Sequence, residues 1–492
     1  MAGHGVTLGA VAASLEGVRS ISGPDVTITS ITHDSRKVGP GVLFVAIAGQ
    51  RSDGHDFASA AVAAGASGLL LERPVEYDVG QIIVPDTRVA MAWAARTVYG
   101  EPDLSLEIVG VTGTNGKTTV SHMCESIWHV AGRRTGLIGT LGARIGGEPI
   151  PIERTTPEAT ELQELLGTMR DQRVEVVAME VSSHAIALHR AEAIAFAVVA
   201  FTNLSQDHLD FHRDMDAYLE AKASLFTSGR ARASVINIDD PYGRRVRDIN
   251  EIPGLTVGSG QDSDVRITDV RDSAAETNFV LHHSGKALSI RIPLIGSFNV
   301  SNAALAGAIA ISTGVDPAAI ADGLANVPVI SGRMEVIDHP GPFTVIVDYA
   351  HTPDAISEVL QAAKAAATGR VIAVIGAAGD RDRAKRSLMG AAAVRFADIT
   401  VITSDNPRSE DPATIAGEVQ RGADAVPGSN ARTVLDRREA IVDALSMARH
   451  HDIVLILGKG HEQGIEAHGV LAPFDDRVEA KAALNALGWE TP

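Results

Sequence analysis

The sequence is poor in cysteine and in positive charge, and it lacks long apolar runs. Cys124 is the only cysteine among 492 residues, so no intrachain disulfide is possible and nothing indicates an oxidising compartment. No apolar run reaches the roughly 18 residues of a membrane span, and no Lys or Arg precedes the apolar residues of the first segment, MAGHGVTLGAVAAS. We therefore expect no membrane partner, no secretory signal and a location in the cytoplasm.

Negative charge exceeds positive charge by a wide margin. The chain has 61 Asp and Glu against 43 Lys and Arg, which gives a formal net charge of -18. Nucleic acids and anionic membranes bind positive surfaces, so this balance argues against nonspecific binding to either. An anionic ligand must therefore be held by a local positive site.

Short apolar runs alternate with helical patterns along most of the chain, which is typical of an α/β protein with a mostly parallel sheet. The length predicts about three domains, and the Gly- and Pro-bearing linkers YGEPDLS and NVPVISGRME would separate them. We predict an N-terminal domain over 1–103, a central doubly wound domain over 104–331 and a Rossmann-like C-terminal domain over 332–492. Four apolar strands of the last domain end in Gly, Asp or Asn turns, where open α/β sheets bind ligands.

The segment IVGVTGTNGKTT contains the strongest functional motif. An apolar strand, a glycine-rich turn and a helix beginning at Lys117 would aim backbone N–H groups at an anion, with the positive end of the helix dipole behind them. Lys117 would reach the outer phosphates of a nucleotide, and the Thr118 hydroxyl would ligate Mg²⁺. Val111 occupies the place of the first glycine in the strict phosphate-loop pattern, so this is not the ordinary loop of motor and switch NTPases. The alternative is a tight glycine turn with a solvated lysine.

This variant, GTNGKTT, resembles the ATP loop of the Mur-type amide ligases, a family that includes the folylpolyglutamate synthetases. In that family ATP phosphorylates a substrate carboxylate, and an incoming amine displaces the phosphate to form an amide bond. The resemblance implies ATP and Mg²⁺ as cofactors. It also implies a nucleotide-binding loop made of Gly113, Thr114, Asn115, Gly116, Lys117, Thr118 and Thr119.

Lys222 falls on the apolar face of a predicted helix. In DMDAYLEAKASLF it shares a three-to-four spacing with Met215, Tyr218, Leu225 and Phe226, so it is directed at the interior. Burial lowers the pKa of a lysine and leaves a more nucleophilic neutral amine, whereas the alternative is a lysine whose ammonium snorkels to solvent. YLEAKASLF resembles the family segment whose lysine is carbamylated. The resemblance therefore implies that carbamylated Lys222 is an anionic oxygen ligand for Mg²⁺.

Glu180 and His208 are the other expected metal ligands. Glu180 ends the apolar run VEVVAM at the ligand-binding end of a strand, where a capping or salt-bridge role is the alternative. His208 lies in TNLSQDHLDFH beside Asp207, Asp210 and His212, a composition suited to a metal or phosphate site, although a lone histidine is more often structural. Both segments resemble family motifs. The resemblance implies that Thr118, Glu180, His208 and Lys222 hold Mg²⁺ and that Lys117, Glu180, His208 and Lys222 are catalytic.

Further nucleotide contacts are expected on both sides of the second linker. Asn299 and Asn302 in GSFNVSNA resemble family asparagines near the adenine, although Asn299 also suits a helix N-cap. Arg333 in SGRME and Asp348 in VDYAHTPD resemble the third domain's contacts to phosphates and ribose. If all of these reach one ATP, the central and C-terminal domains must close on it.

The resemblance covers most of the chain, from HDSRKVGPGVLFVAIAG to GKGHE. TTPEA and EVSSHA resemble the branch of the family that extends UDP-N-acetylmuramoyl-L-alanyl-D-glutamate. Hydroxyls and an arginine suit such a ligand of sugar, amide and carboxylate, although Leu188 departs from the glutamine of some relatives. By this likeness the UDP-muramoyl dipeptide would contact Ser35, Gln50, Arg51, Ser52, Thr155, Thr156, Ser182 and Arg190.

The segment SDNPRSEDP is expected to select the incoming amino acid. Alone it would be an ordinary turn after a strand, with an exposed arginine. In the family, DNPR accompanies ligases that use meso-diaminopimelate, whose far carboxylate can pair with Arg408 in a bidentate manner. L-Lysine lacks that group, and a guanidinium left unpaired supports discrimination of roughly 10⁴ or more. The resemblance implies that Arg381, Asp405, Asn406, Pro407, Arg408, Gly458 and Glu462 bind the amino acid, with Glu462 at the ammonium group.

The sequence thus predicts an ATP-dependent carboxylate–amine ligase of peptidoglycan precursor synthesis. It would phosphorylate the D-glutamyl γ-carboxylate, and the neutral amine of diaminopimelate would attack the acyl phosphate. An L-lysine-adding ligase of the same family is the nearest alternative, and a nucleotide-dependent switch or motor comes from another class. The phosphate loop disfavours a pure UDP-sugar-binding protein. We expect a monomer that binds small molecules and no nucleic acid.

Overall fold

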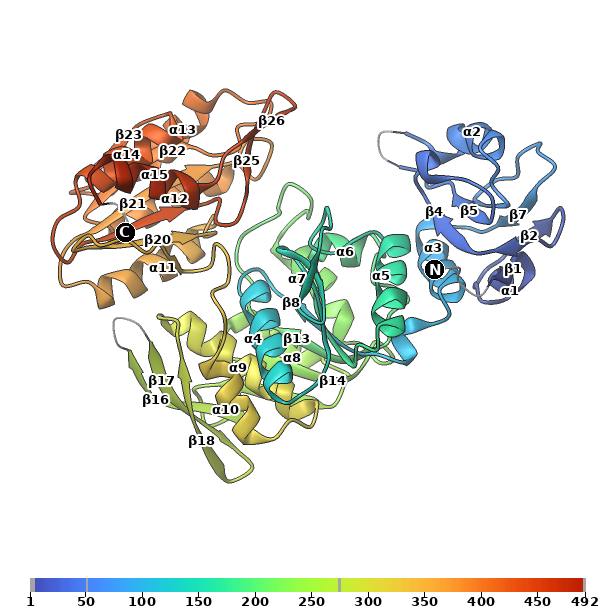
Figure 1. Cartoon of the computed structure of the whole chain (residues 1–492), viewed down its shortest axis with the longest axis horizontal. Helices are drawn as coiled ribbons and strands as arrows, with labels where there is room; N and C mark the ends of the chain where they lie inside the picture. The colour runs from blue at the N-terminus through green and yellow to red at the C-terminus, as the bar shows by residue number, and fades with distance from the viewer. Residues whose placement is uncertain (1–4, 50–51, 273–275, 490–492) are drawn as a thin grey trace.

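The computed structural model describes residues 5–49, 52–272 and 276–489, and these residues form three large β-sheets covered by helices. In Figure 1 the N-terminal sheet lies on the right, the central sheet in the middle and the C-terminal sheet at the upper left. The predicted multidomain α/β class is confirmed. The predicted boundaries near residues 103 and 331 fall between the sheets and stay a prediction.

The N-terminal sheet is parallel except at one edge, where β2 pairs antiparallel with β7. Its order is β2 (Ser20–Ser22), β7 (Gly80–Ile83), β6 (Gly68–Leu71), β5 (Val42–Val45) and β4 (Ser30–Thr32). A separate pair is formed by β1 (Val6–Thr7) and β3 (Thr27–Ile28). The helices of this part are α1 (Leu8–Ala13), η1 (Ser35–Lys37), η2 (Gly54–Phe57), α2 (Ala58–Ala63), α3 (Thr87–Val98) and η3 (Pro102–Leu104).

The central sheet has a parallel middle and an antiparallel hairpin at each end. Its order is β11 (Glu148–Ile150), β10 (Gly142–Ile145), β9 (Thr135–Gly139), β12 (Val176–Glu180), β8 (Glu107–Thr112), β13 (Phe196–Phe201), β14 (Ala231–Asn237), β15 (Gly254–Gly258), β16 (Val265–Asp272), β17 (Thr277–His283) and β18 (Lys286–Ile292). In sheet order, the seven strands from β9 through β12, β8, β13, β14 and β15 to β16 pair in parallel, which agrees with the predicted mostly parallel sheet. The flanking hairpins, in which β10 and β17 alternate buried with partly buried residues, were not predicted.

Helices cover both faces of this sheet, which makes it doubly wound. Val109 and Val111 of β8 pack with Val120 of α4, whereas Ile108 packs with Leu162 of α5, because successive side chains of a strand point to opposite faces. The helices are α4 (Lys117–Val130), α5 (Ala159–Asp171), α6 (Ser183–Ala187), α7 (Met215–Ala223), η4 (Ser224–Phe226), α8 (Pro241–Ile249), α9 (Ser297–Ser312) and α10 (Pro317–Ala325).

The C-terminal sheet is parallel apart from its edge strand β19. Its order is β19 (Glu335–Val336), β20 (Thr344–Asp348), β24 (Ile453–Leu457), β21 (Val371–Ala377), β22 (Ile399–Ser404) and β23 (Ala431–Thr433). Its helices are α11 (Pro353–Ala366), α12 (Ala384–Phe396), α13 (Pro412–Asp424), α14 (Arg437–Ser446) and α15 (Asp476–Ala486), and β25 (Gly464–Ala467) pairs with β26 (Val470–Pro473).

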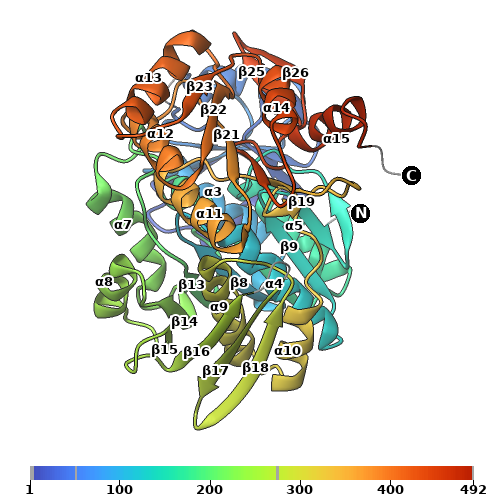
Figure 2. The same cartoon turned by 90° about the vertical axis from the view of Figure 1, so that its left-hand side faces the viewer.

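Parallel pairing places the carboxyl ends of β20, β21, β22 and β24 at one edge, so the turns that follow these strands lie close together. Figure 2 shows the C-terminal part above the central sheet and the β16–β18 strands at the far end of the molecule. Among the described residues, none of the helices has the length and apolar character that a bilayer crossing requires.

Candidate active site

The glycine-rich loop joins β8 to α4 as predicted, and the helix begins at Lys117. Gly113 and Gly116 adopt φ values of 145° and 86°, which L side chains rarely tolerate. A Cβ on Gly113 would lie 1.8 Å from the Thr202 hydroxyl oxygen, so no larger residue fits there. The first N–H groups of a helix have no partner within it and carry a partial positive charge, so the loop suits a phosphate.

The Glu180 carboxylate lies at the start of α4 and is fully buried. Its Oε2 accepts a hydrogen bond from the Thr118 hydroxyl at 3.1 Å, while Thr140 donates to both carboxylate oxygens. The carboxylate forms no ion pair with another described residue, so the salt bridge considered from sequence does not describe it, whereas its bond from the Thr140 backbone N–H resembles the capping role. Thr118 and Glu180 instead present two neighbouring oxygen atoms.

Arg333, which follows α10 in the chain, contacts Thr118 beside the Glu180 carboxylate. Its Nη2 donates to the Thr118 hydroxyl at 3.1 Å, and its guanidinium lies 4.5 Å from the ring centroid of Tyr349. Asp348 accepts hydrogen bonds from the backbone N–H groups of Met334 and Ala350, and burial raises its pKa. The two predicted third-domain residues therefore line the same cavity as the loop.

Asn299 and Asn302 form another wall of that cavity. The N-cap of α9 is Gly296, so the N-cap role considered for Asn299 is wrong. Asn302 donates to the Asn299 side chain at 3.3 Å, and a Cβ on Gly116 would lie 2.3 Å from its Oδ1, which places it against the loop. Apolar side chains complete the lining beside the asparagines: Leu294, Phe298, Ala355 and Val359.

Lys222 is directed inward, as its helical spacing predicted. It is 1% exposed, so the alternative of a snorkelling ammonium is wrong. Its Nζ donates to the Gly113 carbonyl at 2.8 Å and lies 4.7 Å from the ring centroid of Tyr218. Burial, together with the charge of Lys117, holds the pKa of Lys222 well below its ordinary value. A larger fraction of this amine is therefore neutral at physiological pH than of a surface lysine.

The four polar residues 207, 208, 210 and 212 do not gather into one site. Asp207 and His208 line the cavity, but His212 contacts the Ser183 hydroxyl at 2.9 Å and Asp210 is exposed. Burial lowers the pKa of His208 to about 3, so its imidazole is neutral and can act as a ligand. No three His, Cys, Asp or Glu side chains form a metal-binding group within the described residues.

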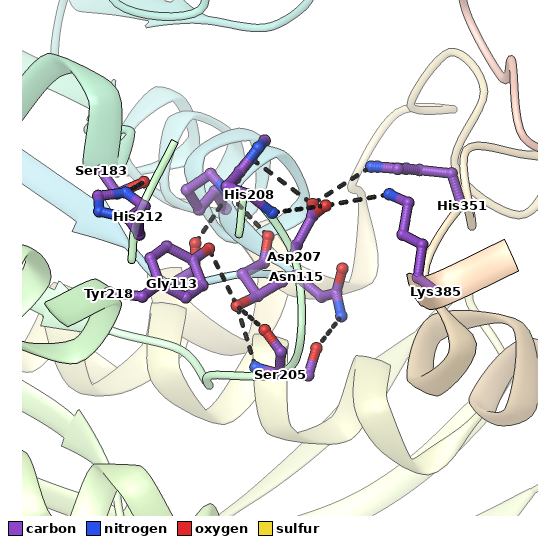
Figure 3. A network of polar contacts seen from close by, with 12 residues as sticks. Gly113, Asn115, Ser183, Ser205, Asp207, His208, His212, Tyr218, His351 and Lys385 are labelled. Carbon is purple, nitrogen blue, oxygen red and sulfur yellow. Dashed lines mark hydrogen bonds and ion pairs between the residues drawn. The ribbon is translucent and has the colours of Figure 1, made fainter. Parts of the chain in front are cut away.

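Asp207 connects the central part of the chain to the C-terminal part. Figure 3 shows its carboxylate between Lys385, at 3.0 Å, and His351, at 3.5 Å. Burial alone would raise the pKa of Asp207, but the hydrogen bond from His351 and the charge of Lys385 hold it well below its ordinary value. Ser205, two residues before Asp207, hydrogen-bonds with Thr114 of the glycine-rich loop. A continuous set of contacts thus joins the loop to α12.

The turn after β22 is more constrained than an exposed Asx-turn. Arg408 has a φ of 51° and is only partly exposed; it donates to Glu466 at 3.1 Å and to the Gly379 carbonyl at 2.6 Å. Its Nη2 has no hydrogen-bond partner among the described residues, so it remains able to bind a carboxylate. Asn406 donates to Glu462 at 2.8 Å, which brings together two of the predicted amino-acid contacts.

Sequence reasoning missed Lys459, which lies between Asn406 and Glu462, two of the predicted amino-acid contacts. Its side chain is fully buried, and its Nζ donates to Asn406 at 3.1 Å and to Glu462 at 2.9 Å. Its place in GKGHE between Gly458 and Glu462 was the available signal. Gly458 has a φ of 113°, and Arg381 is exposed and donates a hydrogen bond to the Asp380 carbonyl.

Comparison with known proteins agrees with this geometry. Three family models match the chain: the Mur ligase family, catalytic domain, at residues 27–99, the Mur ligase middle domain at 111–310, and the Mur ligase, glutamate ligase domain at 332–460. A UDP-N-acetylmuramoyl-L-alanyl-D-glutamate--2,6-diaminopimelate ligase of Streptomyces coelicolor is 44% identical over 477 residues, 94% of each chain. The chain belongs to the Mur ligase family.

Other relatives of this Mur ligase carry the same name. The protein of Syntrophomonas wolfei is 43% identical over 467 residues, which cover 94% of this chain and 95% of the relative. A solved structure with that name has 35% sequence identity and a TM-score of 0.67 over 94% of this chain and 96% of its own. Mycobacterium tuberculosis folylpolyglutamate synthase complexed with ADP and AMPPCP has a TM-score of 0.62 at 21% identity over 82% of this chain and 96% of its own, which shows a shared fold.

The residues predicted to hold the muramoyl dipeptide form a further group in this Mur ligase. Thr156 donates to the Glu180 carbonyl at 2.9 Å, and Arg190 donates to the Thr156 carbonyl at 3.2 Å and pairs with Glu158 at 2.8 Å. Thr155 and Ser182 line the cavity of the glycine-rich loop. Ser35 begins η1 on the N-terminal part, Ser52 is exposed, and the predicted contacts of Gln50 and Arg51 lie outside the described residues.

Proposed function

We propose that this Mur ligase adds meso-diaminopimelate to UDP-N-acetylmuramoyl-L-alanyl-D-glutamate with consumption of ATP, in peptidoglycan precursor synthesis. Relatives with that name are 40% to 44% identical over nearly the whole chain. The observation that carries the proposal is the single cavity lined by the glycine-rich loop, Glu180, Arg333 and Asp348. Cytoplasmic location and a monomeric state stay predictions.

The loop would hold the triphosphate of ATP, with Lys117 and Arg333 near its outer phosphates. Lys117 now donates to the carbonyls of Gly113 and Thr114 at 2.9 and 2.7 Å, and it would exchange these for phosphate oxygens. Asn299 and Asn302 would contact the adenine, and Asp348 the ribose. Thr119 lines the same cavity and completes the loop.

Two oxygen atoms of the site fit the geometry of Mg²⁺. The Thr118 hydroxyl and the Glu180 carboxylate are 3.1 Å apart. Adjacent ligands of an octahedral ion with metal–oxygen distances of about 2.1 Å are separated by about 3.0 Å. Mg²⁺ held there would supply positive charge to the phosphates and the reacting carboxylate. His208 and the anionic form of Lys222 would complete the protein's share of the ligands.

Lys222 is suited to carbamylation by its burial. The ammonium first releases one proton to solvent; the neutral amine then forms an N–C bond with CO₂ and releases a second proton, so a cation next to Lys117 is replaced by an anion. The exchange removes a like-charge contact at a buried side chain, where such contacts are strong. The anionic group would then balance Lys117 and provide oxygen for the metal.

Catalysis would follow from the position of these groups. The D-glutamyl γ-carboxylate attacks the γ-phosphorus of ATP, ADP leaves, and an acyl phosphate forms. The neutral amine of diaminopimelate then attacks the acyl carbon, phosphate leaves and the amine loses a proton. Lys117, Arg333 and the metal would offset the negative charge that gathers on the phosphoryl oxygens.

The L-lysine-adding activity is a second candidate, and one contact favours it. Glu466 pairs with Arg408 and is itself partly exposed, so it could accept the side-chain ammonium of L-lysine. The Arg408 guanidinium would then lack the carboxylate that meso-diaminopimelate provides, which disfavours L-lysine.

A test compares amine acceptors with the UDP-muramoyl dipeptide and ATP present. We expect meso-diaminopimelate to give stoichiometric ADP and a product whose mass equals dipeptide plus diaminopimelate minus water. L-Lysine should react at least about 10⁴-fold less efficiently. ADP release without either amine, or equal use of both amines, would refute the proposal.

A further inference from the structure

Arg437 and Asp476 form a fully buried ion pair behind the amino-acid site. Both side chains are 0% exposed, and two hydrogen bonds of 2.7 Å join the guanidinium to the carboxylate. Arg437 is the first residue of α14 and Asp476 the first of α15. Neither residue lines the cavity of the glycine-rich loop.

Arg437 also donates to two strands of the C-terminal sheet. Its Nη2 donates to the Leu457 carbonyl at 2.9 Å, and its Nη1 donates to the Ser404 carbonyl at 3.3 Å. Leu457 is the last residue of β24, and Ser404 is the last residue of β22. These two strands are not neighbours, because β21 lies between them.

The residues that follow Ser404 and Leu457 in the sequence belong to the proposed amino-acid site. Asp405 follows Ser404 and opens the turn of Asn406 and Arg408, while Gly458 follows Leu457 and opens the turn of Glu462. A planar guanidinium held by a bidentate carboxylate has a fixed direction. It therefore fixes the carbonyls of both strand ends relative to each other.

We infer that Arg437, oriented by Asp476, is a positioning residue for the incoming amino acid: it sets the spacing between the turn that carries Arg408 and the turn that carries Glu462. This inference rests on the proposed function. Arg437 and Asp476 would not touch the amino acid themselves but would act through the turns that carry Arg408 and Glu462. A fixed spacing matters because the two ends of diaminopimelate must be gripped at once, and a small misplacement of binding groups weakens catalysis strongly.

The chain offers a matched control at the amino-terminal ends of the strands of the same sheet. Arg370 pairs with Asp452 at 2.6 Å and donates to the Met447 carbonyl, also at 2.6 Å. Arg370 precedes β21 and Asp452 precedes β24. This pair holds the amino ends of the strands, away from the turns of the proposed site.

The experiment uses paired apolar replacements in the full chain. Removing one partner would leave a buried charge unpaired, whereas replacing both with apolar residues of similar size is often nearly neutral for stability. The test variant is Arg437→Met with Asp476→Leu, and the control is Arg370→Met with Asp452→Leu. Melting temperature and the KM values for diaminopimelate, ATP and the UDP dipeptide are measured for each.

We expect the test variant to raise the KM for diaminopimelate by about tenfold or more, with the KM for ATP within about twofold of the parent. The control should change only the melting temperature. Arg437→Lys, which keeps the cation but not the planar fork, should give an intermediate KM for diaminopimelate. If the double variant does not fold, this single variant tests the positioning role instead. An unchanged KM for diaminopimelate overturns the inference. A parent enzyme that forms no amide from diaminopimelate overturns the proposed function itself.

Discussion

Lys117 and Lys222 donate hydrogen bonds to the same oxygen atom, the Gly113 carbonyl, at 2.9 and 2.8 Å. One lysine comes from the helix after the glycine-rich loop and the other from α7, more than 100 residues later. Two ammonium groups on one acceptor repel each other, and burial lowers the pKa of both. An anionic Lys222 would turn this repulsion into attraction.

The first prediction concerns Lys222. Lys222→Ala should lower turnover by about 100-fold or more, because the variant lacks the anionic group proposed to hold Mg²⁺. Short carboxylates such as acetate should restore part of the activity by entering the space left by the side chain. Turnover is measured as ADP release against carboxylate concentration.

Lys286→Ala is the control for Lys222, since Lys286 is exposed on β18, far from the loop. It should match the parent enzyme with and without acetate. Full activity of Lys222→Ala would contradict the carbamate role.

The second prediction concerns Arg408. Arg408→Lys should raise the KM for diaminopimelate by about 10- to 100-fold, because it removes the charge-assisted hydrogen bond that the free Nη2 would donate to the far carboxylate, worth about 1.5–3 kcal/mol. The KM for ATP should stay close to that of the parent. Arg421→Lys, at an exposed arginine of α13, serves as the control. Equal changes in both KM values would refute the selectivity argument.

Much of the fold and of the phosphate site follows from local sequence patterns. The helix start at Lys117, the burial of Lys222 and the turns after β20, β22 and β24 were predicted, because each depends on residues a few positions apart. Roles for these residues came from resemblance and stay predictions.

Contacts between distant segments could not be predicted in the same way. Asp207 and Lys385 are 178 residues apart, and Arg437 and Asp476 are 39 apart. In the sequence Lys385, Arg437 and Asp476 look like ordinary charges, and nothing near Asp207 indicates its partner; only the packing of helices against the sheets brings them together. The pairing of Arg408 with Glu466 was missed for the same reason, because the β25–β26 hairpin delivers Glu466.

The third prediction concerns the contact between the central and C-terminal parts. Asp207→Asn and Lys385→Met should each lower kcat/KM for ATP. The double variant should lose less than the sum of the two single-variant losses, expressed as free energies, with a coupling free energy of about 0.5–3 kcal/mol. The reason is that both partners are buried and only 3.0 Å apart. A double-mutant cycle on kcat/KM for ATP gives the coupling.

Arg383→Met is the control for that cycle. Arg383 lies two residues before Lys385 but pairs with Glu418 in the same part of the chain. Its combination with Asp207→Asn should be additive. A coupling near zero between positions 207 and 385 would show that their contact does not bear on catalysis.

The fourth prediction concerns Glu180. Glu180→Gln keeps one acceptor oxygen and the size of the side chain but loses the negative charge. The Mg²⁺ concentration for half-maximal activity should therefore rise by roughly tenfold or more. Glu175→Gln, at an exposed residue just before β12, should leave the Mg²⁺ dependence unchanged. A variant at 180 with parental Mg²⁺ dependence would remove Glu180 from the proposed ligands.

The most direct test follows the oxygen atoms of the substrate carboxylate. UDP-muramoyl dipeptide labelled with ¹⁸O in its D-glutamyl γ-carboxylate is converted with ATP and meso-diaminopimelate, and the inorganic phosphate is analysed by mass spectrometry. Phosphorylation of the carboxylate predicts that one labelled oxygen appears in phosphate for each amide formed. Unlabelled phosphate, released at the same rate as amide product, would contradict transfer of the γ-phosphoryl group to this carboxylate.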